Sequence, residues 1–208
     1  MFGYSMEDVG NIVVMQGFSG LSLFSVLLLM ALGLAIIFGQ MGVINMAHGE
    51  FMTVGAYTTV FLSKMAVEFD IVNSYFIFAI IAAFILAFFI GYFVEYALIR
   101  HLYKRPLDTL LATWGLSLVM QQIFRSTFGA KEVSAELPEW LLGSFKPTPD
   151  IDIPINGVFV MGLALIVTVG VYLFMFRSRG GLRIRATVQN RMMAGAVGIN
   201  TQKVDRLT

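Results

Sequence analysis

The sequence predicts an all-α membrane protein, a polytopic transmembrane helix bundle with about five spans, and three observations predict this class. Hydrophobic residues make up 58% of the 208 residues and charged residues only 13%, against about 25% charged residues in ordinary soluble domains. The mean hydropathy is +0.80, and a soluble monomer of this composition would expose large apolar patches to water. Long uncharged runs recur along the chain. These properties exclude a disordered chain, a nucleic-acid-binding protein and a soluble enzyme as leading interpretations.

The uncharged runs locate the spans, because about 20 apolar residues cross the hydrocarbon core as a helix. They predict spans at about 17–39, 46–63, 71–98, 107–124 and 154–176. The second span is the least regular, since its uncharged part is short. Residues 1–8 carry acids where a signal peptide carries bases, so the first span is expected to be retained. Residues 1–176 therefore form the predicted bundle.

The uneven distribution of lysine and arginine predicts the orientation, because cytoplasmic loops collect these residues. With the N-terminus outside, ten of the 14 basic residues lie on the inner side: Arg100, Lys104, Arg105, Arg177, Arg179, Arg183, Arg185, Arg191, Lys203 and Arg206. The outer side then holds Lys64, Arg125, Lys131 and Lys146 together with most of the acids. The N-terminus is therefore predicted to lie outside, and residues 177–208 in the cytoplasm.

Residues 125–153 are predicted to form an outer loop. Four of the five prolines lie in or next to it: Pro138, Pro147, Pro149 and Pro154. Proline breaks helices and stiffens the chain. We therefore expect irregular structure here, with one short helix at about 136–142.

Residues 39–50 are the most polar part of the membrane region, with three glycines and the side chains of Asn45, His48 and Glu50. Irregular backbone at membrane depth occurs where it is buried in protein or lines a wet cavity, and ionisable groups there are often functional. The segment is either an inner turn in which Asn45 caps the second helix or a cavity lining, and the two are compatible. His48 and Glu50 share no helix face, so no metal site and no cofactor are expected.

The fourth predicted span carries a polar stripe of Thr113, Ser117 and Gln121, spaced by four residues, with Gln122 beside it. In lipid such a stripe must face protein or water, because an unsatisfied amide in hydrocarbon costs several kcal/mol. It either bonds neighbouring helices or lines a path for a small polar solute.

The inner tail divides into two parts. Residues 177–185 form a basic flank suited to anionic lipid. Residues 187–197 predict one short helix, with an apolar side of Val188, Met192 and Ala196 beside Met193 and Val197. Gly198 is expected to end this helix in the left-handed conformation, and Asn200 or Thr201 to start the next. Lipid headgroups or a groove on a partner protein would cover the apolar side.

Residues 39–57 resemble the early signature of permeases of branched-chain amino acid ABC transporters. Residues 105–122 are more similar to the urea-transporting branch, and the inner tail resembles the coupling loop, with Ala194 and Gly198 at its alanine and glycine. The resemblance implies an ABC importer permease without enzymatic activity of its own, in a bacterial plasma (inner) membrane. Its implied partners are a second permease subunit, two cytoplasmic ATP-binding subunits and an external solute-binding protein.

The polar residues, the apolar side of the short helix and, for Ala194 and Gly198, the resemblance together give two candidate sites. The candidate substrate path comprises Asn45, His48, Glu50, Thr113, Ser117, Gln121 and Gln122, and the candidate ATPase-coupling residues are Val188, Met192, Ala194 and Gly198. The largely uncharged path residues suit urea, with branched-chain amino acids or amides as the alternative; a passive urea or water channel and a non-transporting assembly subunit also stay open. Because family members continue past the coupling loop, a fragment ending at Thr208 is expected not to transport alone.

Overall fold

A computed structural model describes residues 6–42, 44–102, 105–129, 131–148 and 151–207. Residues named above that lie outside the described residues are Lys104, Pro149 and Thr208. Within the described residues, five long helices carry the fold: α1 (Met6–Met41), α2 (His48–Glu68), α3 (Val72–Val94), α5 (Pro106–Phe128) and α7 (Ile155–Arg177). The shorter elements are the π-helical turn η1 (Glu95–Ile99), α4 (Arg100–Leu102), α6 (Glu139–Leu142), β1 (Ser144–Thr148), β2 (Ile151–Pro154), α8 (Arg179–Gln189), α9 (Arg191–Ala196) and α10 (Thr201–Leu207).

The helices confirm the predicted fold class. Three segments of the described chain are long and apolar enough to cross a membrane: Asp8–Gly39, Val72–Leu102 and Ile155–Arg177. Helices α2 and α5 have 21 and 23 residues, which also suffices in length, but they are less apolar because they carry polar side chains. Helix α1 begins at Met6, well before the expected start of the first span.

Large apolar side chains cover the outside of the long helices. Phe84 on α3 is 72% exposed and Ile166 on α7 is 70% exposed. In water such a surface would be strongly unfavourable, whereas in a bilayer it is solvated by acyl chains. The helices are therefore built for lipid.

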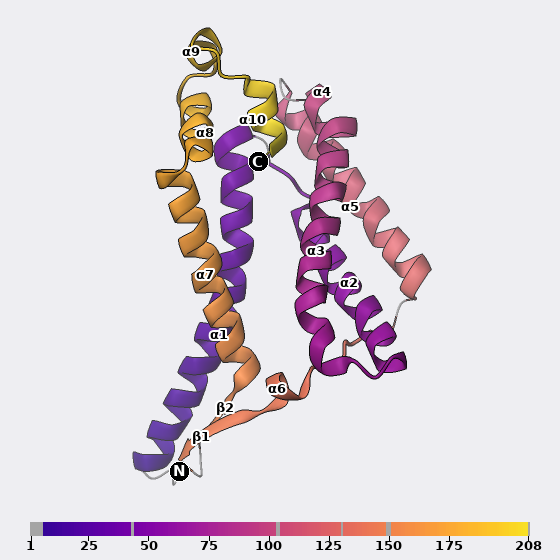
Figure 1. The fold of residues 1–208 in the computed structure, drawn as a ribbon, viewed down its shortest axis with the longest axis vertical. Helices are drawn as coiled ribbons and strands as arrows, with labels where there is room; N and C mark the ends of the chain where they lie inside the picture. Colours follow the sequence, from indigo (N-terminus) through magenta and orange to yellow (C-terminus); the bar gives the residue numbers. More distant parts are fainter. Residues whose placement is uncertain (1–5, 43, 103–104, 130, 149–150, 208) are drawn as a thin grey trace.

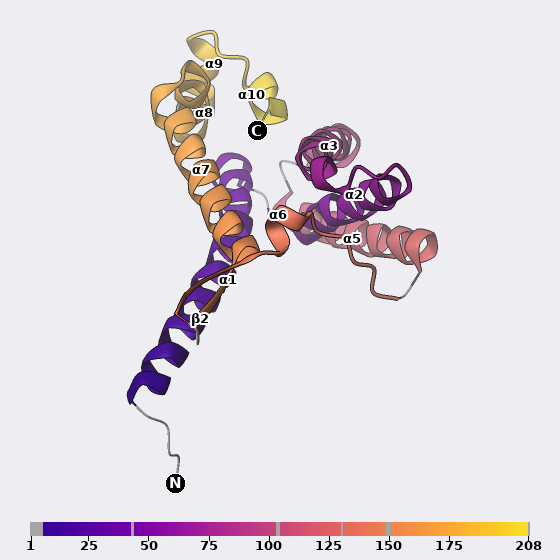
Figure 2. The ribbon, with the colours of Figure 1, turned by 60° about the horizontal axis from the view of Figure 1, so that its bottom comes forward.

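The long helices form two groups. Helix α1 packs along α7, and α2 packs against α3 with α5 beside them (Figure 1; the second view in Figure 2 separates the same groups). Helices α4, α8, α9 and α10 gather at one end of the molecule, and α6, the hairpin and the start of α1 at the other. The segments that the charge pattern assigns to the inner side therefore lie together at one end, and those that it assigns to the outer side lie together at the other.

The segment predicted to form an outer loop contains a β-hairpin, which was not predicted. The short helix α6 lies within the predicted range, but β1 and β2 pair antiparallel, with Ser144 opposite Pro154 and Phe145 opposite Ile153. Both strands of a two-stranded hairpin are edges, where proline is tolerated. The prolines therefore excluded a long helix without excluding strands.

The prediction of one helix at 187–197 is wrong. The basic flank is itself helical as α8, which ends at Gln189, and Asn190 starts α9 by accepting the Met193 N–H at 3.0 Å. An asparagine side chain competes with helical hydrogen bonding and favours a cap. Val188 and Met192 thus lie on different helices.

The predicted end of the inner helix is confirmed. Gly198 has a φ of +86°, and the Ile199 N–H donates to the Ala194 carbonyl at 3.0 Å, as in a Schellman motif. Asn200 then starts α10 by accepting the Lys203 N–H at 3.0 Å.

Candidate functional site

The end of the linker and the start of α2 contact the middle of two other helices, α1 and α5. The His48 imidazole Nε2 is 3.1 Å from the carbonyl oxygen of Met30, about three turns before the end of α1. The Met46 N–H donates to the Thr113 hydroxyl at 3.1 Å, about two turns into α5. Non-helical backbone at this depth must be satisfied by protein groups or water, and these contacts supply part of that satisfaction.

Asn45 stabilises this linker but does not cap α2. Its side-chain oxygen accepts the Ala47 N–H at 3.0 Å, one residue before the helix begins, and the cap position is Ala47. The predicted capping role is therefore wrong. Asn45 is buried and instead forms a local turn of the kind that short amide side chains favour.

Three polar side chains meet where α2 faces α5. The Glu50 carboxylate Oε1 accepts hydrogen bonds from the Ser117 hydroxyl at 3.0 Å and from the Gln121 amide at 2.8 Å. The Gln121 amide also lies 3.1 Å from the Ser117 hydroxyl oxygen. We call Glu50, Ser117 and Gln121 the carboxylate cluster. Ser117 is buried, whereas Glu50 and Gln121 are half-buried, so the cluster keeps a partly open side.

The remaining residues of the predicted path lie apart from the cluster. Thr113 is fully buried and uses its hydroxyl twice, accepting from Met46 and donating to the Leu110 carbonyl at 3.1 Å. Thr113 therefore bonds the linker and its own helix, whereas Ser117 and Gln121 of the same stripe bond Glu50 on the neighbouring helix α2. Gln122 is exposed and is not part of the cluster. His48 faces α1, where a side chain on Gly33 would lie only 3.0 Å from the imidazole.

The carboxylate cluster brings together polar residues from two separate parts of the sequence. The sequence analysis named all three as candidate path residues but could not show that they contact one another. Glu50 lies in the first turn of α2, and its partners Ser117 and Gln121 on α5 are 67 and 71 residues away in the chain. Charge-assisted hydrogen bonds of this kind are stronger than neutral ones. The cluster joins α2 to α5 through a carboxylate.

A second set of polar contacts, which was not predicted, joins the predicted outer loop to the end of α2 and the start of α3. The Ser63 hydroxyl accepts the Glu136 N–H at 2.8 Å, and the Tyr75 hydroxyl donates to the Glu136 carbonyl. Asn73 accepts the Glu139 N–H at 3.1 Å. Buried Ser63 and Tyr75 on otherwise apolar helices are the signal that could have indicated this contact, since buried polar groups need partners.

The predicted coupling residues take different positions. Ala194 is only 3% exposed and packs within the chain, whereas Met192 is 87% exposed. Met193 and Val197 are also exposed and extend the apolar surface around Met192. Val188 lies elsewhere, beside residues of α1 and α7 such as Leu32 and Met175. The large apolar side chains exposed on α9 and at its C-terminal cap are therefore those of Met192, Met193 and Val197. We call them the α9 surface.

The fold and the cluster define a class of protein: integral membrane proteins that place polar side chains and irregular backbone between apolar helices, as transport proteins do. The family model for the permease component of branched-chain amino acid transport systems matches residues 17–208. The chain belongs to this family.

Individual relatives agree with the family. The high-affinity branched-chain amino acid transport permease LivH of Salmonella typhimurium is 28% identical over 93% of this chain and 64% of its own length. LivH of Escherichia coli K12 is 26% identical over the same shares. BraD of Pseudomonas aeruginosa is 28% identical over 91% of this chain and 64% of its own length. The chain thus spans slightly less than two thirds of these relatives. No solved structure matches.

Proposed function

We propose that this chain forms part of the permease of an ATP-driven importer and that the carboxylate cluster lines the solute path. The observation that supports the proposal best is Glu50, an ionisable side chain held by Ser117 and Gln121 between two helices. Polar groups at membrane depth are costly and usually mark a solute or ion pathway. The family supports the transport role. The proposed partners are a second permease subunit, cytoplasmic ATP-binding subunits and an external solute-binding protein.

We propose urea as the solute. Urea offers N–H groups that a carboxylate such as Glu50 accepts, and a carbonyl oxygen that hydroxyl and amide donors such as Ser117 and Gln121 can meet. The cluster contains no cation to receive a carboxylate. The likeness of residues 105–122 to urea permeases also favours urea over a zwitterion.

Branched-chain amino acids are the second candidate, because the relatives' names specify them. The ammonium group of an amino acid would pair with Glu50. Uptake of labelled urea and labelled leucine into vesicles that contain the complete transporter, with and without internal ATP, separates the candidates. ATP-dependent urea uptake is expected. Leucine uptake without urea uptake would contradict the proposed solute, and ATP-independent flux would contradict the importer and indicate a channel.

We further propose that the N-terminus lies outside, on the evidence of the basic residues. The chain contains no cysteine, so a single cysteine reports its own accessibility. Ser144→Cys on the hairpin is expected to react with an impermeant thiol reagent in sealed cells, whereas Asn190→Cys between α8 and α9 is expected to react only after lysis. The opposite labelling pattern would overturn the orientation.

The α9 surface is the proposed docking site for the ATP-binding subunit. Met192→Asp is expected to leave the permease inserted, but to reduce co-purification of the ATP-binding subunits and ATP-driven uptake, because an unpaired charge in a water-excluding groove is strongly unfavourable. Gln202→Asp on α10, also exposed, is the matched control. Ala194→Asp is less informative, since Ala194 is buried and its replacement would disturb the loop itself. Parental co-purification with Met192→Asp would contradict the docking site.

A further inference from the structure

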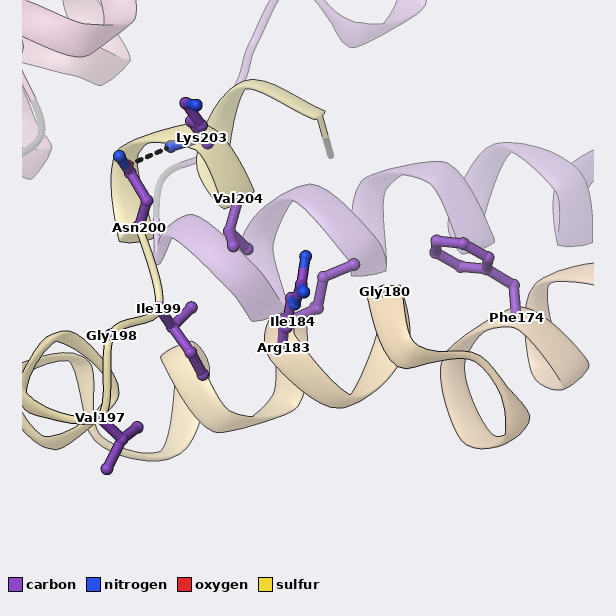
Figure 3. Close-up of a pocket in the computed structure, with 10 residues that line it drawn as sticks. All are labelled: Phe174, Gly180, Arg183, Ile184, Val197, Gly198, Ile199, Asn200, Lys203 and Val204. Carbon is purple, nitrogen blue, oxygen red and sulfur yellow. Dashed lines mark hydrogen bonds between the residues drawn. The ribbon is translucent and has the colours of Figure 1, made fainter.

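A pocket of about 480 Å³ opens between the end of α7, α8 and α10. Its lining residues are Phe174, Gly180, Arg183, Ile184, Val197, Gly198, Ile199, Asn200, Lys203 and Val204 (Figure 3). We propose that it binds one anionic phospholipid of the cytoplasmic leaflet, with the phosphate between Arg183 and Lys203. The proposal uses the orientation proposed above, and it is independent of which solute is carried.

One end of the pocket is apolar and lies beside the last turn of α7. Phe174 belongs to the last turn of α7, which ends at Arg177, and 52% of its surface is exposed. Ile184 and Val204 are buried in the pocket floor. Because α7 is one of the apolar spans, an acyl chain that follows it reaches Phe174 first.

The other end of the pocket is cationic. Figure 3 shows Lys203 and Asn200 at the end opposite Phe174, and Arg183 on α8 between these two ends, next to Ile184. Arg183 comes from α8 and Lys203 from α10, and both side chains are exposed. Among the residues whose side chains the structure describes, none that lines the pocket is acidic. An arginine fork and a lysine ammonium together match a phosphate diester, and basic pockets at the cytoplasmic face bind anionic headgroups.

The space between the two ends depends on Gly180. A side-chain carbon at this position would lie 3.1 Å from the Phe174 ring and would narrow the pocket next to its apolar end. The pocket thus has an apolar entrance beside α7 and two cations beyond it. This order matches an amphiphilic ligand, with an apolar chain and an anionic headgroup. A free phosphate ion would use only the cationic half, and a neutral lipid only the apolar half.

The test uses the complete transporter in detergent, with lipid binding followed by native mass spectrometry. Retention of phosphatidylglycerol in preference to phosphatidylcholine is expected. Replacing both Arg183 and Lys203 with glutamine is expected to weaken phosphatidylglycerol retention about thirtyfold, since each basic residue near an anionic surface contributes about a factor of five. The matched control replaces Arg179 and Lys64 with glutamine, which makes the same change in charge away from the pocket.

The remaining outcomes distinguish the sources of the phosphate. Competition by inorganic phosphate or glycerol phosphate at concentrations that leave phosphatidylcholine binding unchanged would assign the site to a free phosphate and overturn the proposal. Equal phosphatidylglycerol retention in the double variant and the control would also overturn it, as would a pocket covered by a protein segment of the assembled transporter. Because the readout is lipid mass, its failure leaves the uptake test of the transport function unaffected.

Discussion

Replacing Gln121 with leucine is expected to reduce ATP-driven solute uptake by about fivefold or more, whereas the same replacement at Gln122 leaves uptake near the parental rate. The Gln121 amide donates to Glu50 at 2.8 Å and also contacts Ser117. Leucine removes that donor and leaves a carboxylate at membrane depth with one donor fewer, which costs about 1–3 kcal/mol, and each 1.4 kcal/mol corresponds to about tenfold. Gln122 is exposed and provides a control of the same size on the same helix.

The measurement is the initial rate of labelled solute uptake at matched amounts of inserted transporter. Equal rates for the two variants would contradict a role for the carboxylate cluster. Loss of inserted protein with Gln121→Leu alone would instead identify the cluster as a link between α2 and α5. Gln121→Glu would then separate the structural role of the cluster from its role in transport, because it keeps the shape of the side chain but places a second carboxylate beside Glu50.

Gly181→Ala is expected to prevent α8 from packing against α7, whereas Gly180→Ala is tolerated. A side-chain carbon on Gly181 would lie 2.3 Å from the Met175 carbonyl oxygen and 2.4 Å from that of Phe174. Both are backbone atoms of α7, so the helices must separate. The Gly181 N–H also donates to the Ser178 hydroxyl at 2.9 Å, which caps α8. Such overpacking costs about 1–3 kcal/mol or more.

Gly180 is the matched control for this junction. A side-chain carbon there would lie 3.1 Å from the Phe174 ring and 3.5 Å from the Ser178 hydroxyl oxygen. The second distance is an ordinary contact, and an exposed ring can rotate away. Thermal unfolding of the purified transporter and limited proteolysis between α7 and α8 are the readouts. Gly181→Ala is expected to lower the unfolding midpoint and expose the junction to protease. Equal unfolding midpoints for the two alanine variants would show that the packing of α8 against α7 does not depend on the missing side chain of Gly181.

The fold was largely predictable because a bilayer leaves few choices. Uncharged runs of sufficient length must become helices in lipid, so the positions of α3 and α7 follow from hydropathy alone. Gly198 was also predictable, since a glycine after an apolar helix readily takes the left-handed conformation. Asn190 was not recognised as a break because it stands inside an apolar periodicity, and only the competition between its side chain and the helical hydrogen bonds ends α8.

The candidate site was predictable only in part. The spacing of Thr113, Ser117 and Gln121 by four residues is a local property, and it places them on one face of α5. Their partners are not local, because Met46 belongs to the linker and Glu50 to the first turn of α2, and the positions of both depend on how α1, α2 and α5 pack. The same holds for Ser63 and the outer loop. Periodicity predicts faces, whereas pairings between distant segments depend on the three-dimensional fold.

The most direct test of the central claim, that the carboxylate cluster lines the solute path, is the reactivity of a cysteine at Ser117. The parent chain has no cysteine, and a thiol closely replaces the Ser117 hydroxyl in size. In the complete transporter, Ser117→Cys is expected to react with a small water-soluble thiol reagent, and saturating urea is expected to slow that reaction. No reaction in any state of the transport cycle, or a rate unchanged by urea and by leucine, would show that the cluster only joins α2 to α5.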